Sequence, residues 1–286
     1  MANLKEIRNR ISSIKSTMQI TSAMKMVSAA KLKKAQDAIT AMRPYSSKLT
    51  ELLQNLSATL DADAGGDYSK QRKVSKVLLV VITSNRGLCG GFNSSIIKET
   101  IKNIDSNYKD IHVDLLPIGK KGGDILSKTY PILETRNDLF DDLTFDNVAE
   151  VAKKIMNLYV DGTYDKVEII YNRFKNAATQ ISQVEQFLPI KPVEGDTNTN
   201  VDYIFEPSKV DIVLELIPKS LKTQLYKAVR DSFAAEHGAR MTAMHKATDN
   251  AKELRDELLL TYNKARQAAI TNEILEIVGG AEALNN

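Results

Sequence analysis

Two long rows of mainly apolar residues, one at each end of the 286-residue chain, constrain the fold more than any other feature. In each row the residues follow one another at alternating spacings of three and four, the pattern of a helix that packs along a partner helix. The first row consists of Leu4, Ile7, Ile11, Ile14, Met18, Thr21, Lys25, Ser28, Leu32, Ala35, Ile39 and Met42. The second row consists of Met241, Met244, Thr248, Ala251, Arg255, Leu258, Tyr262, Ala265 and Ala269. The rows predict a long antiparallel coiled coil of the N- and C-terminal helices.

Three polar residues, Thr21, Lys25 and Ser28, interrupt the middle of the first row. A lysine within such a seam weakens a two-helix coil unless its amine reaches out to a partner. The segment from Met1 to Arg43 is also strongly basic, because it holds nine basic and two acidic residues while the whole chain has a net charge of only +3. We therefore expect the first helix to be a basic rod that attracts acidic partners.

The middle of the chain has a different sequence pattern, in which apolar runs typical of strands alternate with segments of helical periodicity. Strands are expected at residues 76–83, 112–118, 166–174 and 179–189, and helices after the glycine-rich turn Ser84–Gly91 and at residues 119–128 and 145–160. This alternation is typical of a largely parallel sheet covered by helices, with the last two strands forming an antiparallel edge. The overall prediction is an α+α/β protein with a central Rossmann-like α/β domain.

The expected division of the chain follows from these patterns. It comprises an N-terminal shaft helix (1–60), a linker (61–75), a central α/β domain (76–206) and a long C-terminal shaft helix (207–286). Pro44 predicts a bend or boundary in the first helix and Pro218 a kink in the second, which is expected to extend to about Val278. Seventy helical residues span roughly 105 Å, whereas a compact chain of this length has a radius of gyration near ~19 Å. The helices are therefore expected to project from the globular domain.

Few residues suggest catalysis or metal binding. Cys89 is the only cysteine, which excludes an internal disulfide, and the three histidines lack metal-ligand spacing. The loop Gly87–Gly91 fits neither the dinucleotide nor the Walker pattern, so a tight structural turn is favoured over a phosphate cradle. We expect no cofactor and no metal, and the longest apolar run, Val77–Ile82, is too short to span a membrane.

The C-terminal tip has more apolar residues than a single helix–helix seam can bury. They are Ala268, Ala269, Ile270, Ile274, Leu275, Ile277, Val278, Ala281, Ala283 and Leu284. A partner protein is expected to enclose this tip.

Three separated motifs resemble the gamma subunit family of F-type ATP synthases. They are the run from Ile7 to Gln36, the loop from Thr83 to Asn93 and the run from Ala265 to Ala281. The motifs occur in the family's order and span nearly the whole chain. The resemblance implies a non-catalytic central rotor stalk that turns within a hexamer of alpha and beta subunits and rests on the c-subunit ring beside epsilon.

The resemblance also implies roles for particular residues. The contact with the beta subunits would involve Arg8, Arg10, Met24, Lys25, Lys31, Lys33, Arg266, Gln267, Thr271 and Glu273. The bearing tip would extend from Ile274 to Leu284 and include Ile277 and Val278, and the foot on the c ring and epsilon would include Tyr203, Phe205 and Glu206. Asn85 departs from the family, which usually has aspartate there, so a role for that negative charge is not expected.

Two other function classes fit part of the sequence. A free-standing coiled-coil adaptor would explain the helices but not the apolar tip, and a nucleotide-binding enzyme would use Asn85, Arg86 and the glycines of the central loop. The start of the chain contains no signal-peptide pattern, and the resemblance implies a peripheral location on the cytoplasmic face of a bacterial inner membrane.

Overall fold

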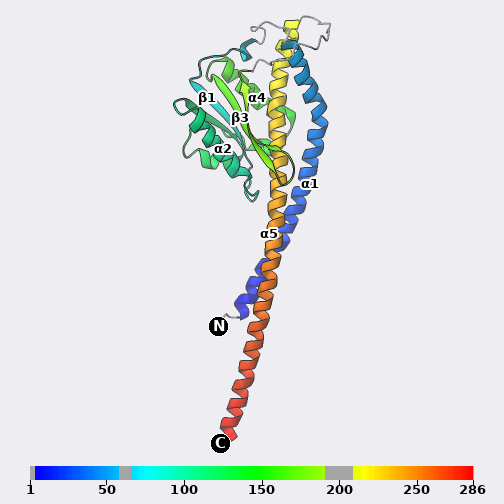
Figure 1. Ribbon diagram of the computed structural model, residues 1–286, viewed down its shortest axis with the longest axis vertical. Coiled ribbons are helices and arrows are strands. Elements are labelled where there is room, and N and C mark those ends of the chain that lie inside the picture. Colours follow the sequence, from blue (N-terminus) through cyan, green and yellow to red (C-terminus); the bar gives the residue numbers. More distant parts are fainter. Residues whose placement is uncertain (1–3, 58–65, 191–208, 286) are drawn as a thin grey trace. The chain divides into compact units, whose positions relative to one another are not determined.

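The computed structural model describes residues 4–57, 66–190 and 209–285 (Figure 1). The chain forms two compact units, one from Met1–Ser28 with Met241–Asn286 and the other from Ala29–Arg240. Two long helices, α1 (Leu4–Ser57) and α5 (Lys209–Asn285), contribute to both units. The predicted helices at the two ends of the chain are thus confirmed.

Neither proline ends its helix. Pro44 lies inside α1 and Pro218 inside α5, so of the bend or boundary expected at Pro44 the boundary is wrong. An internal proline removes one backbone hydrogen bond and costs about 3 kcal/mol. The buried side of α1 before Pro44, which includes Leu32, Ala35 and Ile39, supplies packing that can offset this cost. Helix α5 continues past Val278 to Asn285.

A four-stranded sheet forms the centre of the second unit. Its strands are β1 (Lys76–Ile82), β2 (His112–Ile118), β3 (Lys166–Phe174) and β4 (Gln180–Leu188), in the order β2-β1-β3-β4. Strand β1 pairs in parallel with β2 and β3, whereas β4 is antiparallel to β3. The predicted parallel sheet with an antiparallel edge is therefore confirmed.

Alternate residues of β1 pack on opposite faces of the sheet, as the period of a strand requires. Val77, Leu79 and Val81 contact the cluster that includes α2 (Phe92–Asn107) and α3 (Lys120–Leu126). Leu78 and Val80 belong to the opposite cluster, which includes α4 (Phe145–Val160). Two single-turn helices, η1 (Gly66–Tyr68) and η2 (Asp138–Phe140), complete the described elements.

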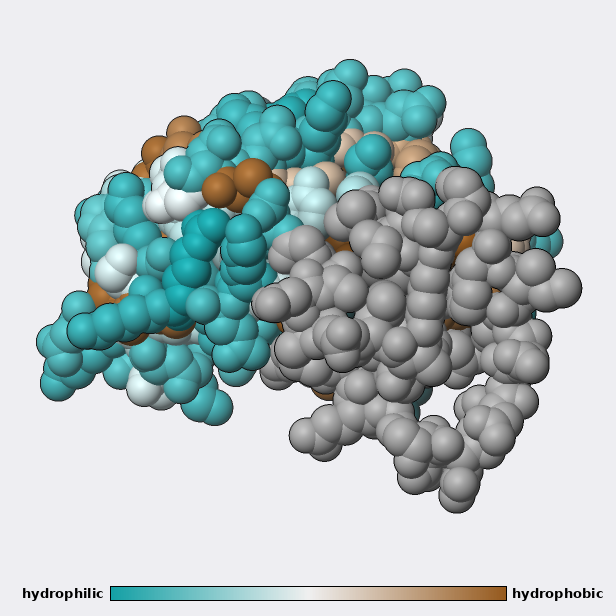
Figure 2. Space-filling model, turned by 90° about the horizontal axis from the view of Figure 1, so that it is seen from above, coloured by the Kyte–Doolittle hydropathy of each residue, from teal (hydrophilic) through white to brown (hydrophobic). Residues whose placement is uncertain are grey.

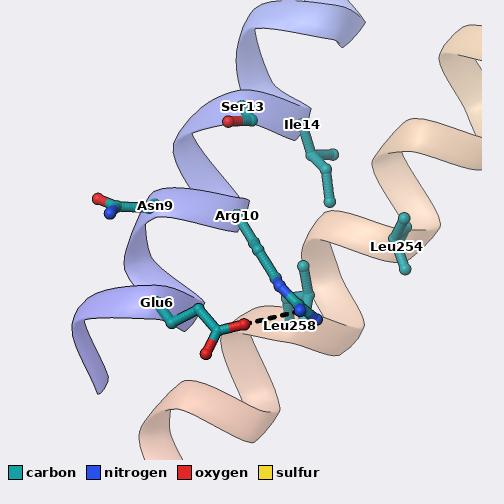
Figure 3. Close-up of a pocket in the computed structure, with 7 residues that line it drawn as sticks. All are labelled: Glu6, Asn9, Arg10, Ser13, Ile14, Leu254 and Leu258. Carbon is teal, nitrogen blue, oxygen red and sulfur yellow. Dashed lines mark hydrogen bonds and ion pairs between the residues drawn. The ribbon is translucent and has the colours of Figure 1, made fainter. Parts of the chain in front are cut away.

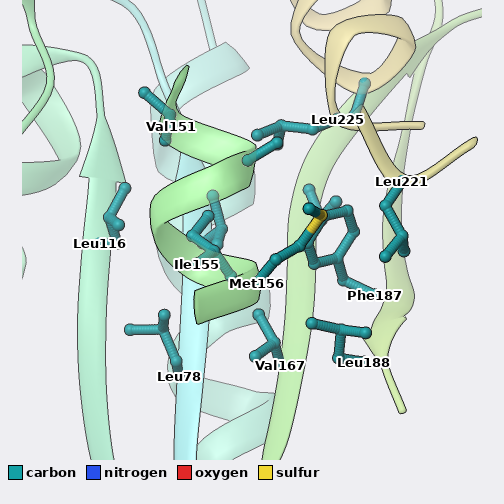
Figure 4. Packing of buried hydrophobic residues seen from close by; sticks show 14 of the residues in the cluster. Leu78, Leu116, Val151, Ile155, Met156, Val167, Phe187, Leu188, Leu221 and Leu225 are labelled. Carbon is teal, nitrogen blue, oxygen red and sulfur yellow. The ribbon is translucent and has the colours of Figure 1, made fainter. Parts of the chain in front are cut away.

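Helix α5 is part of this core. Ile217, Leu221 and Leu225 are buried in the same cluster as α4 and the end of β4, and Figure 4 shows Leu221 and Leu225 beside Phe187. Further along α5, a Cβ on Gly238 would lie 3.1 Å from the Cα of Ala177. A glycine at this position therefore lets the helix approach the turn between β3 and β4 closely.

The coloured surface in Figure 2 is mainly hydrophilic, and its hydrophobic residues form small separate groups. Among the described helices, none is long and apolar enough to cross a membrane.

Candidate functional site

The two helices pair in opposite directions within the first unit. The Oγ1 of Thr248 on α5 lies 2.8 Å from the Oγ1 of Thr21 on α1, and farther along α5 a guanidinium nitrogen of Arg255 lies 3.9 Å from the Sδ of Met18. Every predicted position from Leu4 to Ser28 and from Met241 to Ala269 is buried or half-buried. The predicted antiparallel pairing of the two helices and their predicted seam positions are therefore confirmed in this unit.

Lys25 lies in the seam of α1 and contacts a residue of α5. Its half-buried side chain brings Nζ to 3.4 Å from the Nδ1 of His245. The same Nδ1 lies 3.3 Å from a carboxylate oxygen of Asp249, one turn later on α5. The imidazole thus lies between a lysine and a carboxylate.

Beside the seam, the helix pair forms a shallow hollow of about 370 Å³ (Figure 3). Leu254 and Leu258 line one side of it, and Arg10 lines the other with its guanidinium 2.7 Å from the carboxylate of Glu6. Because both charged side chains are largely exposed, this pair contributes at most about 1 kcal/mol to stability.

The other predicted contact residues occupy exposed surfaces. On α1, Arg8, Lys31 and Lys33 are exposed and Met24 is half-buried. On α5, Arg266, Gln267, Thr271 and Glu273 are all exposed. Most of the side chains predicted to contact partners are thus exposed, and Met24 is half-buried.

The end of α5 carries large apolar side chains in solvent. Residues 270–281 are all exposed, and they include Ile274, Leu275, Ile277 and Val278, with Ile277 71% exposed. Exposed apolar rows of this kind are typical of surfaces that contact another protein. The side chain of Leu284 and the foot residues Tyr203, Phe205 and Glu206 lie outside the described residues.

The glycine-rich loop after β1 is held by its own side chains. Ser84 donates a hydrogen bond from Oγ to the carbonyl oxygen of Arg86 at 2.7 Å, and the side-chain oxygen of Asn93 accepts one from the backbone N–H of Ser84 at 2.9 Å. Asn85 joins two neighbouring segments, since its amide nitrogen donates to the carbonyl of Asn137 at 2.8 Å and its oxygen accepts from the backbone N–H of Lys120 at 3.0 Å. These contacts support the prediction of a tight structural turn.

A buried ion pair connects this loop to α5. The guanidinium of Arg240 contacts the carboxylate of Glu236 at 2.6 Å and also donates to the carbonyl oxygens of Gly87 and, at 3.2 Å, Arg86. Burial raises the pKa of Glu236, while the nearby positive charges oppose that rise. This connection could not be predicted from the sequence, because the spacing of four between Glu236 and Arg240 indicates an ion pair on one helix but not its long-range partner.

His237 lies on the same turn of α5 and is only 5% exposed. Its ring packs edge-on against Phe233 with the centroids 4.5 Å apart, and neither ring nitrogen has a hydrogen-bond partner among the described residues. Burial and the charges of Lys31 and Arg240 lower its pKa to about 4. The imidazole is therefore neutral at pH 7 and acts as a packing group.

The described residues thus define a helical shaft protein with a covered α/β sheet, whose exposed surfaces are suited to binding other chains. No group of three or more His, Cys, Asp or Glu residues in the described parts could hold a metal ion. The buried Cys89 has a raised pKa because of burial, so its thiol is protonated at neutral pH.

Comparisons with known proteins identify the family. Residues 3–284 match the family model described as ATP synthase. The ATP synthase gamma chain of Flavobacterium psychrophilum is 72% identical over 99% of both chains, and that of Flavobacterium johnsoniae is 71% identical over the full length of both. The chain belongs to the ATP synthase gamma chain family, as its motifs predicted.

Solved structures agree with this assignment. A chain from the central stalk/c-ring structure of Tetrahymena thermophila mitochondrial ATP synthase is 28% identical, with a TM-score of 0.61, and the match covers 80% of this chain and 99% of that chain. A chain from the Euglena gracilis mitochondrial ATP synthase has the same fold, with a TM-score of 0.70 at 22% identity over 98% of this chain and 94% of that chain.

Proposed function

We propose that this chain is the central rotor shaft of a bacterial F-type ATP synthase. In this proposal it turns within a hexamer of alpha and beta subunits and couples ion flow through the c ring to ATP synthesis or hydrolysis at the beta subunits. Residues 1–60 and 207–286 form the shaft, and residues 61–75 and 76–206 form the linker and the central domain. The chain itself catalyses no reaction.

The observation that carries the proposal is the exposed apolar end of α5. Ile274, Ile277 and Val278 each expose more than half of their side chains, although an ordinary free surface would hold polar residues at most of these positions. An enclosing ring of partner subunits would cover them. The family assignment, together with the resemblance to a chain from a central stalk structure, supports alpha and beta subunits as that ring.

The exposed charges suit the same role. Arg8, Lys31 and Lys33 would meet acidic segments of the beta subunits, and Arg266 and Glu273 would pair with polar groups near the tip. An asymmetric shaft touches each beta subunit differently, and contacts that differ between states shift a conformational equilibrium. Rotation would therefore cycle every catalytic site through the same series of states.

The proposal also covers the remaining partners and the location. Tyr203, Phe205 and Glu206 would form the foot on the c ring and epsilon. The complex would place the chain at the cytoplasmic face of the inner membrane as a peripheral subunit.

Reconstitution tests the proposal. The purified chain alone should hydrolyse no ATP, whereas mixing it with alpha and beta subunits from the same bacterium should produce a stable complex with raised ATPase activity. Removing Thr271–Asn286 should weaken assembly and torque because the exposed apolar end is lost. The proposal would be contradicted if the chain hydrolysed ATP alone, formed only a homodimer or failed to bind the alpha and beta subunits.

A further inference from the structure

His245 of α5 lies between two groups that require opposite protonation states of one nitrogen atom. Its Nδ1 is 3.4 Å from the Nζ of Lys25 on α1 and 3.3 Å from a carboxylate oxygen of Asp249. A lysine ammonium can only donate hydrogen bonds, and an ionised carboxylate can only accept them. Nδ1 therefore binds one neighbour at a time, because it accepts from Lys25 when it carries no proton and donates to Asp249 when it carries one.

These two neighbours are the main charges around the imidazole. Lys25 is the only charged residue of α1 within four positions in either direction. On α5, only Lys246 and Asp249 are charged within four positions of His245. Lys246 is exposed and directly follows His245, a spacing at which helical side chains do not face each other. The hydrogen bonding of His245 is thus decided between Lys25 and Asp249.

Protonation of His245 removes one of its two options. A neutral imidazole carries one proton and can leave Nδ1 free to accept from Lys25, whereas an imidazolium carries a proton on both nitrogens. Its Nδ1–H then donates to Asp249, and its positive charge repels the ammonium of Lys25. Both His245 and Asp249 are exposed, so protons from the solvent reach this site. Histidine side chains change charge between about pH 5 and 8, so the exchange falls in the physiological range.

We propose that His245 is a proton-controlled switch for Lys25. At higher pH the neutral imidazole binds the ammonium of Lys25 to α5, and at lower pH the imidazolium binds Asp249 and releases it. The released ammonium is then available to a carboxylate of a partner. Under the proposed function, on which this last step rests, the carboxylate belongs to an acidic segment of a beta subunit.

The exchange within the chain can be measured without a partner. Nitrogen NMR of the full chain at about pH 8, where most histidines are neutral, reports how often Nδ1 carries the proton. Lys25→Met removes the donor, so the population with a proton on Nδ1 should rise about threefold relative to the unprotonated one, the effect of one weak hydrogen bond. Lys246→Met makes the same change at a residue that does not face His245, and it should leave the populations unchanged.

Two substitutions fix the switch in its two positions. His245→Gln is neutral at every pH, and its amide oxygen can still accept from Lys25. His245→Lys is positively charged throughout this range and should pair with Asp249.

Binding to the purified hexamer of alpha and beta subunits then tests the consequence. When the pH falls from about 8 to 6, the affinity of the unchanged chain should rise about threefold relative to that of His245→Gln. His245→Lys should keep one constant ratio to His245→Gln, because neither variant titrates there. His112→Gln changes an exposed histidine of β2 and should retain the full pH response.

The outcomes separate the inference from the proposed function. If the unchanged chain does not bind the hexamer at any pH, the proposed function fails, while the NMR comparison still decides whether the switch exists. If the chain binds with the same pH response as His245→Gln, only the inference is overturned. Equal Nδ1 populations in the unchanged chain and in Lys25→Met would also overturn it.

Discussion

Thr248 of α5 and Thr21 of α1 share a hydrogen bond of 2.8 Å between their hydroxyl oxygens in the middle of the seam. Both hydroxyls also lie near carbonyl oxygens of their own helices, Met244 and Met18. A polar pair at the centre of a coiled coil fixes the register of the two helices, usually with some loss of stability.

Removing one member of this pair should destabilise the chain. Thr248→Val leaves the hydroxyl of Thr21 without its cross-helix partner and should cost about 1 kcal/mol, measured as a lower urea midpoint. Adding Thr21→Val should restore the midpoint to at least the original value, because two apolar side chains then face each other. Thr261→Val, which removes only a bond within α5, is the matched control. Additive effects of the two seam variants would contradict a direct bond.

Lys25→Glu should impair coupling more than folding. The substitution brings a carboxylate toward Asp249 across His245, but these side chains are partly exposed, so the stability loss should stay within about 1 kcal/mol. Under the proposed function, coupled ATPase activity of the complex should fall several-fold, because the substitution would reverse a positive charge that faces acidic segments of beta. Lys98→Glu, on the exposed surface of α2, makes the same charge change and should leave coupling intact. Parallel losses of melting temperature and activity would indicate a purely structural lysine.

His237 should make stability depend on pH. Its folded pKa of about 4 lies below the ordinary value of 6.5, so between these values the unfolded chain binds the extra proton. Stability is therefore fully present above pH 6.5 and is lost as pH falls toward 4, by up to about 3 kcal/mol. His237→Leu should flatten this part of the curve relative to the original chain, whereas His112→Gln, at an exposed position, should not. Identical pH curves for His237→Leu and the original chain would exclude a buried neutral imidazole.

Asn85→Asp should be destabilising, although the family resemblance implies that aspartate is usual at this position. A carboxylate can still accept from the backbone of Lys120, but it cannot donate to the carbonyl of Asn137. The expected loss is about 1–2 kcal/mol in urea unfolding. Asn176→Asp is a close control, because the side-chain oxygen of Asn176 only accepts hydrogen bonds, from Ala178 and Thr179. If the two variants were equally stable, the bond to Asn137 would contribute nothing.

Much of the fold could be predicted from the sequence because it depends on local periodicity. The spacing from Leu4 to Ser28 and from Met241 to Ala269 identified every buried seam position in the paired unit. The apolar run of β1 and the glycines after it likewise predicted a buried strand and a tight turn. Single prolines predicted helix ends less well. At Pro44 the helix continues, because tertiary packing offsets the loss of one backbone hydrogen bond.

The long-range contacts could not be predicted in the same way. Arg240 binds carbonyl oxygens more than 150 positions earlier in the chain, and no sequence pattern encodes that pairing. Leu225 looked like part of a free shaft helix, yet it is buried in the core of the α/β unit. No sequence pattern distinguishes His237 as a buried histidine whose ring nitrogens lack hydrogen-bond partners among the described residues.

Single-molecule rotation is the most direct measurement of the central claim. The hexamer of alpha and beta subunits is fixed to a surface, and a visible probe is attached to the chain at an exposed position such as Lys98. On addition of ATP, the chain should turn stepwise in one direction and stop when ATP is exhausted. A hexamer that hydrolyses ATP while the bound chain stays stationary would contradict the rotor function.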